Sequence, residues 1–148
     1  MEIVTAAVDD IPALVDLLSI LFAQEAEFSP DSQAHTRGLA TIMSNPDIGL
    51  IVVAKDQGQV IGMVNILFTV STALGERVGI LEDMIVSPAW RGAGIGTRLL
   101  RQAIAQAQEQ GCRRLTLLTD ADNRSAHRFY ERHGFVLSEM VPFRLVLK

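Results

Sequence analysis

Hydrophobic positions along the chain follow two spacings, one typical of helices and one typical of strands. Apolar residues three and four apart, with fitting start and stop residues, predict helices over 9–28, 31–44, 95–110 and 123–133. Compact or alternating apolar runs predict strands over 2–6, 49–55, 60–70, 78–86 and 113–119. The last segment, 134–148, predicts one or two further strands around Pro142.

The order of these elements predicts a single domain, residues 1–148, of the α/β (α+β) class. The turn "DQGQ" between the strands at 49–55 and 60–70 predicts an antiparallel hairpin. The strand–loop–helix–strand order over 78–119 predicts a parallel pair at the core.

Composition narrows the classes of partner. The formal net charge of −4 does not favour nucleic-acid binding, and no apolar run approaches the roughly 20 residues that span a membrane. The single cysteine, Cys112, excludes an intrachain disulfide and fits the cytoplasm, and the acidic N-terminus predicts no signal peptide. His35, His127 and His133 lack the spacing of metal ligands, so we expect no metal.

The stretch "VSPAWRGAGIGTRLL" places three glycines where a strand passes into a helix. Such a turn is typical of a phosphate-binding cradle, because helix N-terminal amides and close backbone approach favour an anion. A Walker A loop is a poor match, since Thr97 and Arg98 follow Gly96 where that motif has lysine. A dinucleotide fingerprint fails too, because Leu99 occupies its third glycine position.

A third pattern fits the stretch. Arg91-x-x-Gly94-x-Gly96, followed by N-x-x-A-x-x-F-Y-x-x-x-G-F from Asn123 to Phe135, resembles the motif block of the GNAT superfamily of acyl-CoA-dependent N-acyltransferases. The resemblance covers 78–136 and is closest to small-amine-type bacterial-like members. It implies a mixed, mostly antiparallel sheet of 6–7 strands, splayed at a parallel pair and flanked by about four helices.

The resemblance implies acetyl-CoA as co-substrate, without metal. Loop amides would bind the pyrophosphate, and the pantetheine arm would pair with the strand ending at Val86. The cofactor-binding residues implied are Met84, Ile85, Val86, Arg91, Gly92, Ala93, Gly94, Ile95, Gly96, Thr97, Asn123 and Tyr130. The signature accepts many residues at position 92, so we expect Gly92 to be the most replaceable of the three glycines.

Tyr130 is the only tyrosine of the chain. The family usually places at this position the residue that faces the coenzyme sulfur, which implies a general acid for the departing thiolate. The alternative is a core aromatic, although the adjacent Phe129 suits that role better. Asn123 is expected to cap the helix and to contact the coenzyme arm.

Glu82 and Asp83 are adjacent charges in an apolar strand, which is unusual. Alternation places Leu81, Asp83 and Ile85 on one face and Glu82 on the other, unless a bulge intervenes. We expect Glu82 to be the general base, through water, and Asp83 to bind the cationic amine. An ion pair with a neighbouring arginine is the alternative.

These observations predict an N-acetyltransferase that transfers an acetyl group from acetyl-CoA to a primary amine of a small molecule, by direct attack in a ternary complex. A protein or peptide amine is the alternative acceptor. A non-catalytic acyl-CoA-binding module is the alternative of another class. Many members of the family that the chain resembles are dimers, so a homodimer is expected. The single cysteine adds the expectation of a cytoplasmic location.

Overall fold

The computed structural model describes residues 1–25 and 27–148. The chain divides into two compact units, Met1–Leu118 and Thr119–Lys148, and each is described by itself. No helix in the described part of the chain is long and apolar enough to cross a bilayer.

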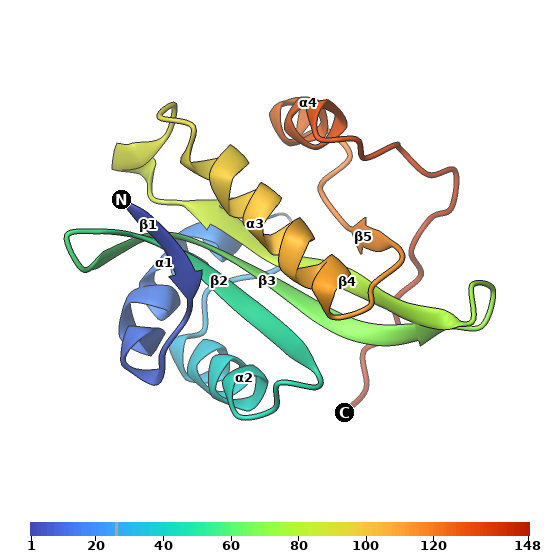
Figure 1. The fold of residues 1–148 in the computed structure, drawn as a ribbon, viewed down its shortest axis with the longest axis horizontal. Coiled ribbons are helices and arrows are strands. Elements are labelled where there is room, and N and C mark those ends of the chain that lie inside the picture. Colours follow the sequence, from blue (N-terminus) through green and yellow to red (C-terminus); the bar gives the residue numbers. More distant parts are fainter. Residues whose placement is uncertain (26) are drawn as a thin grey trace. The chain divides into compact units, whose positions relative to one another are not determined.

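The first unit is built on a five-stranded sheet with strands in sequence order, seen in Figure 1. Its strands are β1 (Glu2–Thr5), β2 (Gly49–Asp56), β3 (Gln59–Ser71), β4 (Glu76–Val86) and β5 (Leu115–Leu117). Neighbouring strands are antiparallel except for β4 and β5, which are parallel. The predicted hairpin and the predicted parallel pair are therefore both confirmed.

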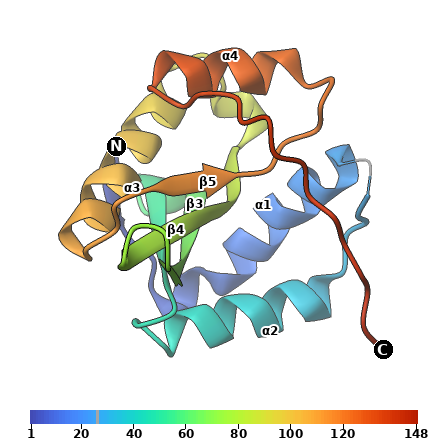
Figure 2. The same ribbon diagram turned by 90° about the vertical axis from the view of Figure 1, so that its right-hand side faces the viewer.

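Helices cover both faces of this sheet (Figure 2). One face carries α1 (Ile11–Gln24) and α2 (Ser32–Met43), and the other carries α3 (Ile95–Glu109). The predicted helix boundaries agree within one or two residues, except that α1 ends at Gln24 rather than at residue 28. Ala26, within the predicted extension of α1, lies outside the described residues.

The hydrophobic core lies on both sides of β2 and β3, because α1 and α2 cover one face of these strands and α3 covers the other. On the α1 side, Leu14, Leu17 and Leu18 of α1 pack with Val53, Met63 and Ile85 of the sheet. On the other side, α3 buries its predicted apolar stripe. The buried members of that stripe are Ile95, Leu99, Leu100, Ala103 and Ala107. Cys112 is buried as well, as expected for a small apolar side chain.

The second unit, Thr119–Lys148, contains α4 (Arg124–Arg132), which brings the chain to four α-helices among the described residues. The strands predicted over 134–148 are wrong, since no strand forms there. The described sheet thus has five strands instead of 6–7. An extended segment becomes a strand only where a neighbour supplies hydrogen-bond partners, and Pro142 lacks the N–H that such pairing needs.

Candidate functional site

The site begins where β5 leaves β4. The two strands pair at only three positions, the last of which joins Leu81 to Leu117. From Asp83 to Val86, β4 pairs with β3 alone. Among the described residues of the first unit, the outer edge of β4 therefore has no strand partner over the residues that the sequence assigns to the pantetheine arm.

The backbone direction along this open edge can be read from one hydrogen bond. The N–H of Ser87 donates to the carbonyl of Ile61 on β3 at 2.7 Å. In a trans peptide the carbonyl of Val86 points the opposite way, away from β3. Since alternate residues of a strand share their direction, the N–H and C=O groups of Met84 and Val86 face outward and those of Ile85 face inward.

Arg91 contacts this edge. Its Nε donates to the carbonyl oxygen of Val86 at 3.2 Å. The contact is exposed, so the guanidinium is in reach of a ligand that lies along β4. Arg91 thus connects the open strand edge to the glycine loop.

A β-bulge interrupts the pairing of β3 with β4 at Glu82. Asn65 pairs with Asp83 and Ile66 pairs with Leu81, so Glu82 is the extra residue. Simple alternation, which places Leu81 and Asp83 on one face, is therefore wrong. Because cross-strand partners share a face, Leu81 lies on the face of Ile66 and Asp83 lies on the face of Asn65.

The bulge gives the two adjacent carboxylates different surroundings. Glu82 is exposed, whereas Asp83 is 8% exposed and lies on the α1 face with Met63 and Ile85. Asn65 binds Asp83 twice. Its Nδ2 donates to Asp83 Oδ2 at 2.9 Å, and its Oδ1 accepts from the Asp83 N–H at 2.9 Å.

Asp83 holds its proton more strongly than an ordinary aspartate. Burial raises the pKa of Asp83 to about 6, the charges of Glu82 and Glu25 add to the rise, and the hydrogen bond from Asn65 opposes it. The carboxyl group is therefore mostly ionised at neutral pH and becomes protonated as the pH falls below about 6. No arginine pairs with Glu82 or Asp83 among the ion pairs of the described residues.

The glycine loop joins β4 to α3. A short helical turn, Pro88–Trp90, is followed by Gly92 with a φ of 83° and Gly94 with a φ of 78°. Gly94 is the N-cap of α3 and supplies no side-chain acceptor. The first backbone hydrogen bond of α3 runs from the Arg98 N–H to the Gly94 carbonyl. The N–H groups of the three residues before Arg98, at positions 95–97, therefore have no acceptor within the helix.

Gly92 departs from the expectation that it is the most replaceable glycine. Its left-handed backbone disfavours any residue with a Cβ, as at Gly94, whereas Gly96 has the ordinary backbone of the first turn of α3. A Cβ on Gly92 or Gly94 would meet no heavy atom within 4 Å beyond its chain neighbours. The constraint at Gly92 is thus conformational and not steric.

In the second unit, α4 carries both remaining site residues. Asn123 caps the helix, since its Oδ1 accepts from the Ala126 N–H at 3.1 Å. Tyr130 makes edge contacts with Phe129 and Phe135, at ring-centroid distances of 5.2 and 5.5 Å. Burial raises the pKa of Tyr130 to about 12, which keeps its phenol protonated at neutral pH. A protonated phenol is what a general acid requires.

The site residues therefore fall into two groups. Residues 82–86 and 91–97 lie together at the β4 edge and the α3 N-terminus of the first unit, and Asn123 and Tyr130 share α4 of the second. Sequence reasoning missed Asn65. Its signal was a lone amide within the apolar run "VIGMVNILFTV".

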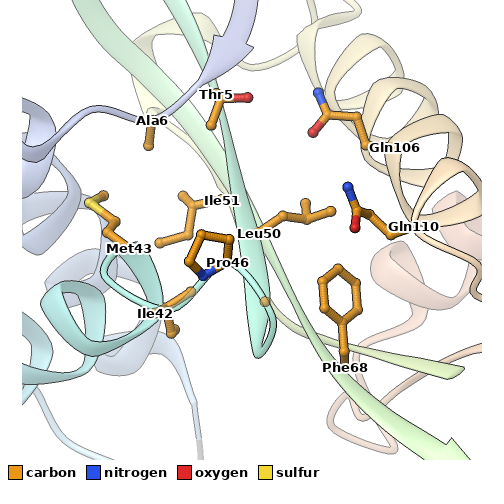
Figure 3. Close-up of a pocket in the computed structure, with 11 residues that line it drawn as sticks. Thr5, Ala6, Ile42, Met43, Pro46, Leu50, Ile51, Phe68, Gln106 and Gln110 are labelled. Carbon is orange, nitrogen blue, oxygen red and sulfur yellow. The ribbon is translucent and has the colours of Figure 1, made fainter. Parts of the chain in front are cut away.

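A groove elsewhere in the first unit shares none of these residues (Figure 3). It has a volume of about 220 Å³ and lies beyond the end of β1, where Ile51 and Met43 meet on one side of β2 and Leu50, Phe68 and Gln106 on the other. Its lining contains no ionisable side chain. No group of His, Cys, Asp and Glu suited to a metal occurs in residues 1–25 and 27–148.

Comparison with known proteins identifies the class. The acetyltransferase (GNAT) family profile matches residues 13–135, and the chain belongs to this family. The family uses acetyl-CoA, and the chain is an acetyl-CoA-dependent N-acetyltransferase. The uncapped amides of α3, the open backbone beside Gly92 and Gly94, and the unpaired edge of β4 fit this co-substrate.

Three similar proteins illustrate the range of the family. The uncharacterized N-acetyltransferase YhfO of Bacillus subtilis is 35% identical over 118 residues, which are 78% of each chain. The aminoalkylphosphonate N-acetyltransferase of Salmonella typhimurium is 28% identical over 90% of this chain and 84% of its own. The structure of an aminoglycoside 6'-N-acetyltransferase from Acinetobacter haemolyticus shares the fold, with a TM-score of 0.80 at 22% identity and coverage of 100% and 99%.

The loop geometry predicts the order of glycine replacements. A left-handed alanine costs about 1–2 kcal/mol, so the free loop of Gly92→Ala or Gly94→Ala should relax away from this backbone. Binding must then restore it, which should weaken coenzyme A binding about fivefold to thirtyfold in each variant. Gly96→Ala adds no such strain, so any loss there reports close approach of the ligand alone. Calorimetric titration with coenzyme A measures all three variants.

Gly38→Ala serves as the matched control, because Gly38 is an exposed residue of α2 with open space around it. This variant should bind coenzyme A as the wild type does and unfold at the same or a higher temperature. Wild-type affinity in Gly92→Ala would contradict the conformational role of that glycine.

Proposed function

We propose that this enzyme acetylates a primary amine of a small molecule, and that the acceptor binds as an ammonium ion beside the bulge of β4. One observation carries the proposal: the bulge of β4 places a buried, hydrogen-bonded carboxylate, Asp83, directly beside an exposed one, Glu82, at the start of the open edge. A buried carboxylate near an exposed one attracts a compact cation. The names of two similar proteins, with aminoalkylphosphonate and aminoglycoside acceptors, support this acceptor class.

We propose that acetyl-CoA binds along the open edge and the glycine loop. The pyrophosphate would accept hydrogen bonds from backbone amides between Arg91 and Thr97. The pantetheine arm would extend the sheet by pairing with the outward groups of Met84 and Val86. Asn123, whose Oδ1 already caps α4, retains its side-chain amino group for contact with the arm.

The chemical step needs a neutral amine and a proton for the leaving sulfur. The amine nitrogen forms a bond to the thioester carbonyl carbon and the carbon–sulfur bond breaks, so one proton leaves the nitrogen and one reaches the thiolate. We propose that Glu82 accepts the first proton through water while Asp83 holds the ammonium, and that Tyr130 donates the second. The protonated state of Tyr130 at neutral pH supports its part.

An acceptor panel tests the proposed function. The enzyme should release coenzyme A thiol from acetyl-CoA in the presence of small primary amines, such as diamines, amino sugars and aminoalkylphosphonates. Peptides with free N-termini or lysines belong in the same panel. Turnover with peptides alone would overturn the small-molecule acceptor and favour the protein alternative.

Tyr130→Phe in the same assay separates an enzyme from a binding module. The change removes the proton donor and keeps the ring, so turnover should fall about a hundredfold while coenzyme A still binds. Equal turnover in the variant would contradict the general-acid role. Coenzyme A binding without turnover in the wild type, with every acceptor, would favour a non-catalytic module.

We further propose that two copies of the chain associate in the cytoplasm. The support for this association is a run of apolar side chains at the C-terminus, all at least 74% exposed, since contiguous exposed apolar surface marks sites of protein–protein contact. Its members are Val136, Leu137, Met140, Val141, Phe143, Leu145, Val146 and Leu147.

Light scattering on the purified protein should give twice the mass of one chain. The double variant Phe143→Ser with Leu145→Ser removes two apolar side chains that are 96% and 82% exposed and should shift the particle toward a monomer. A wild type that is monomeric throughout the micromolar range would contradict the dimer.

A further inference from the structure

Asn65 is a polar side chain in the central strand of the sheet, β3. It is 2% exposed, and its neighbours on β3, Val64 and Ile66, are 0% exposed. Burying an amide is unfavourable unless its groups are hydrogen-bonded. Both bonds that Asn65 makes go to Asp83, opposite the bulge.

The orientation of the Asn65 amide follows from its partners. The backbone N–H of Asp83 can only donate, so the amide oxygen must face it. The Asn65 Nδ2 group then necessarily faces the carboxylate and donates to Asp83 Oδ2. The side chain of Asn65 thus hydrogen-bonds to both the main chain and the side chain of Asp83.

These two hydrogen bonds leave one carboxylate oxygen of Asp83 available. Asp83 Oδ1 makes no hydrogen bond among the described residues, whereas Oδ2 is bound by Asn65. No described side-chain polar atom is both fully buried and without a partner. Asp83 Oδ1 therefore retains access to solvent, although its residue is 8% exposed.

We propose that Asn65 is a positioning residue of the acetyl-transfer site, which fixes Asp83 so that its free oxygen, Oδ1, binds the acceptor ammonium. This inference rests on the proposed function, since it assigns the acceptor to Asp83. It adds a residue that makes no contact with the reacting atoms and acts through Asp83.

The groups around Asp83 determine in which direction the loss of Asn65 would shift the pKa of Asp83. Burial raises the pKa of Asp83 most, and the hydrogen bond from the uncharged Asn65 on β3 lowers it. The charges of Glu82 on β4 and of Glu25 directly after α1 add smaller increases. Neither α3 nor β5 adds a charged group to this set among the described residues. Loss of the Asn65 donor must therefore raise the pKa of Asp83 further and reduce its ionised fraction at neutral pH.

Asn65→Asp is the sharpest variant, because it keeps the size of the side chain and the oxygen that accepts from the Asp83 N–H but replaces the donor with a second acid. The acid limb of the pH profile of kcat/KM should move to higher pH by about one unit or more. For a shift of one unit from a pKa of about 6, the ionised fraction of Asp83 at pH 6.5 falls about threefold, so kcat/KM should fall about threefold or more. The loss should lie in KM for the amine and should shrink by pH 9. KM for acetyl-CoA should not change.

Asn65→Leu is the second variant, which removes both bonds without adding charge and should shift the limb in the same direction. Ser71→Ala is the matched control on β3, since Ser71 is also buried and its hydroxyl accepts a bond from the Leu74 N–H. This control should leave the pH profile unchanged. Thermal unfolding of each variant shows whether it is folded at the assay temperature.

A substrate-free measurement separates this inference from the proposed function. Carbon-13 NMR titration of the Asp83 carboxyl should give an apparent pKa near that of the wild-type acid limb, and a higher one in Asn65→Asp and Asn65→Leu. An unshifted titration in folded variants would overturn the role of Asn65, whatever the acceptor. If the variants shift the titration of Asp83 but the wild type turns over no amine, the Asn65–Asp83 coupling stands. That result would refute the proposed function, and with it the ammonium-binding role.

Discussion

The structure depends on the short pairing of β4 with β5. Parallel strands that stay together satisfy each other's backbone groups, but here the pairing covers three positions and stops at Leu81. The backbone of β4 beyond that point has no strand on its outer side within the first unit. β3 pairs with β4 on its inner side and helices cover both faces of the sheet, so only the outer edge of β4 is left as a template for an extended ligand within the first unit.

The bulge at Glu82 places chemistry beside that template. Without an extra residue, the side chain of Asp83 would lie on the same face of the sheet as Leu81 and its partner Ile66, which is the face toward α3. With it, Asp83 lies opposite Asn65 on the α1 face, where burial and the nearby acids raise its pKa. The cost of placing a carboxylate there is offset by the two hydrogen bonds to Asn65. A local irregularity of one strand therefore determines which carboxylate is buried and hydrogen-bonded and which remains exposed.

Periodic segments were predictable from sequence because their packing is regular. The stripe of α3, the hairpin of β2 and β3, and the glycine loop followed from residue spacing alone. The bulge did not, since period-two alternation continues unless a partner strand shows where the register slips. The left-handed backbone at Gly92 was missed because a motif records residue types and not backbone dihedral angles. The C-terminal strands were overpredicted, because apolar alternation in "FRLVL" says nothing about whether a neighbouring strand is present.

The central claim is that the open edge of β4 pairs with coenzyme A, and residue-resolved hydrogen exchange tests it most directly. The amides of Met84 and Val86 face outward, and the amide of Ile85 faces β3. Saturation with coenzyme A should slow exchange at Met84 and Val86 by an order of magnitude or more, and should leave Ile85 nearly unchanged. Tight binding of coenzyme A with unchanged exchange at both outward amides would contradict the account.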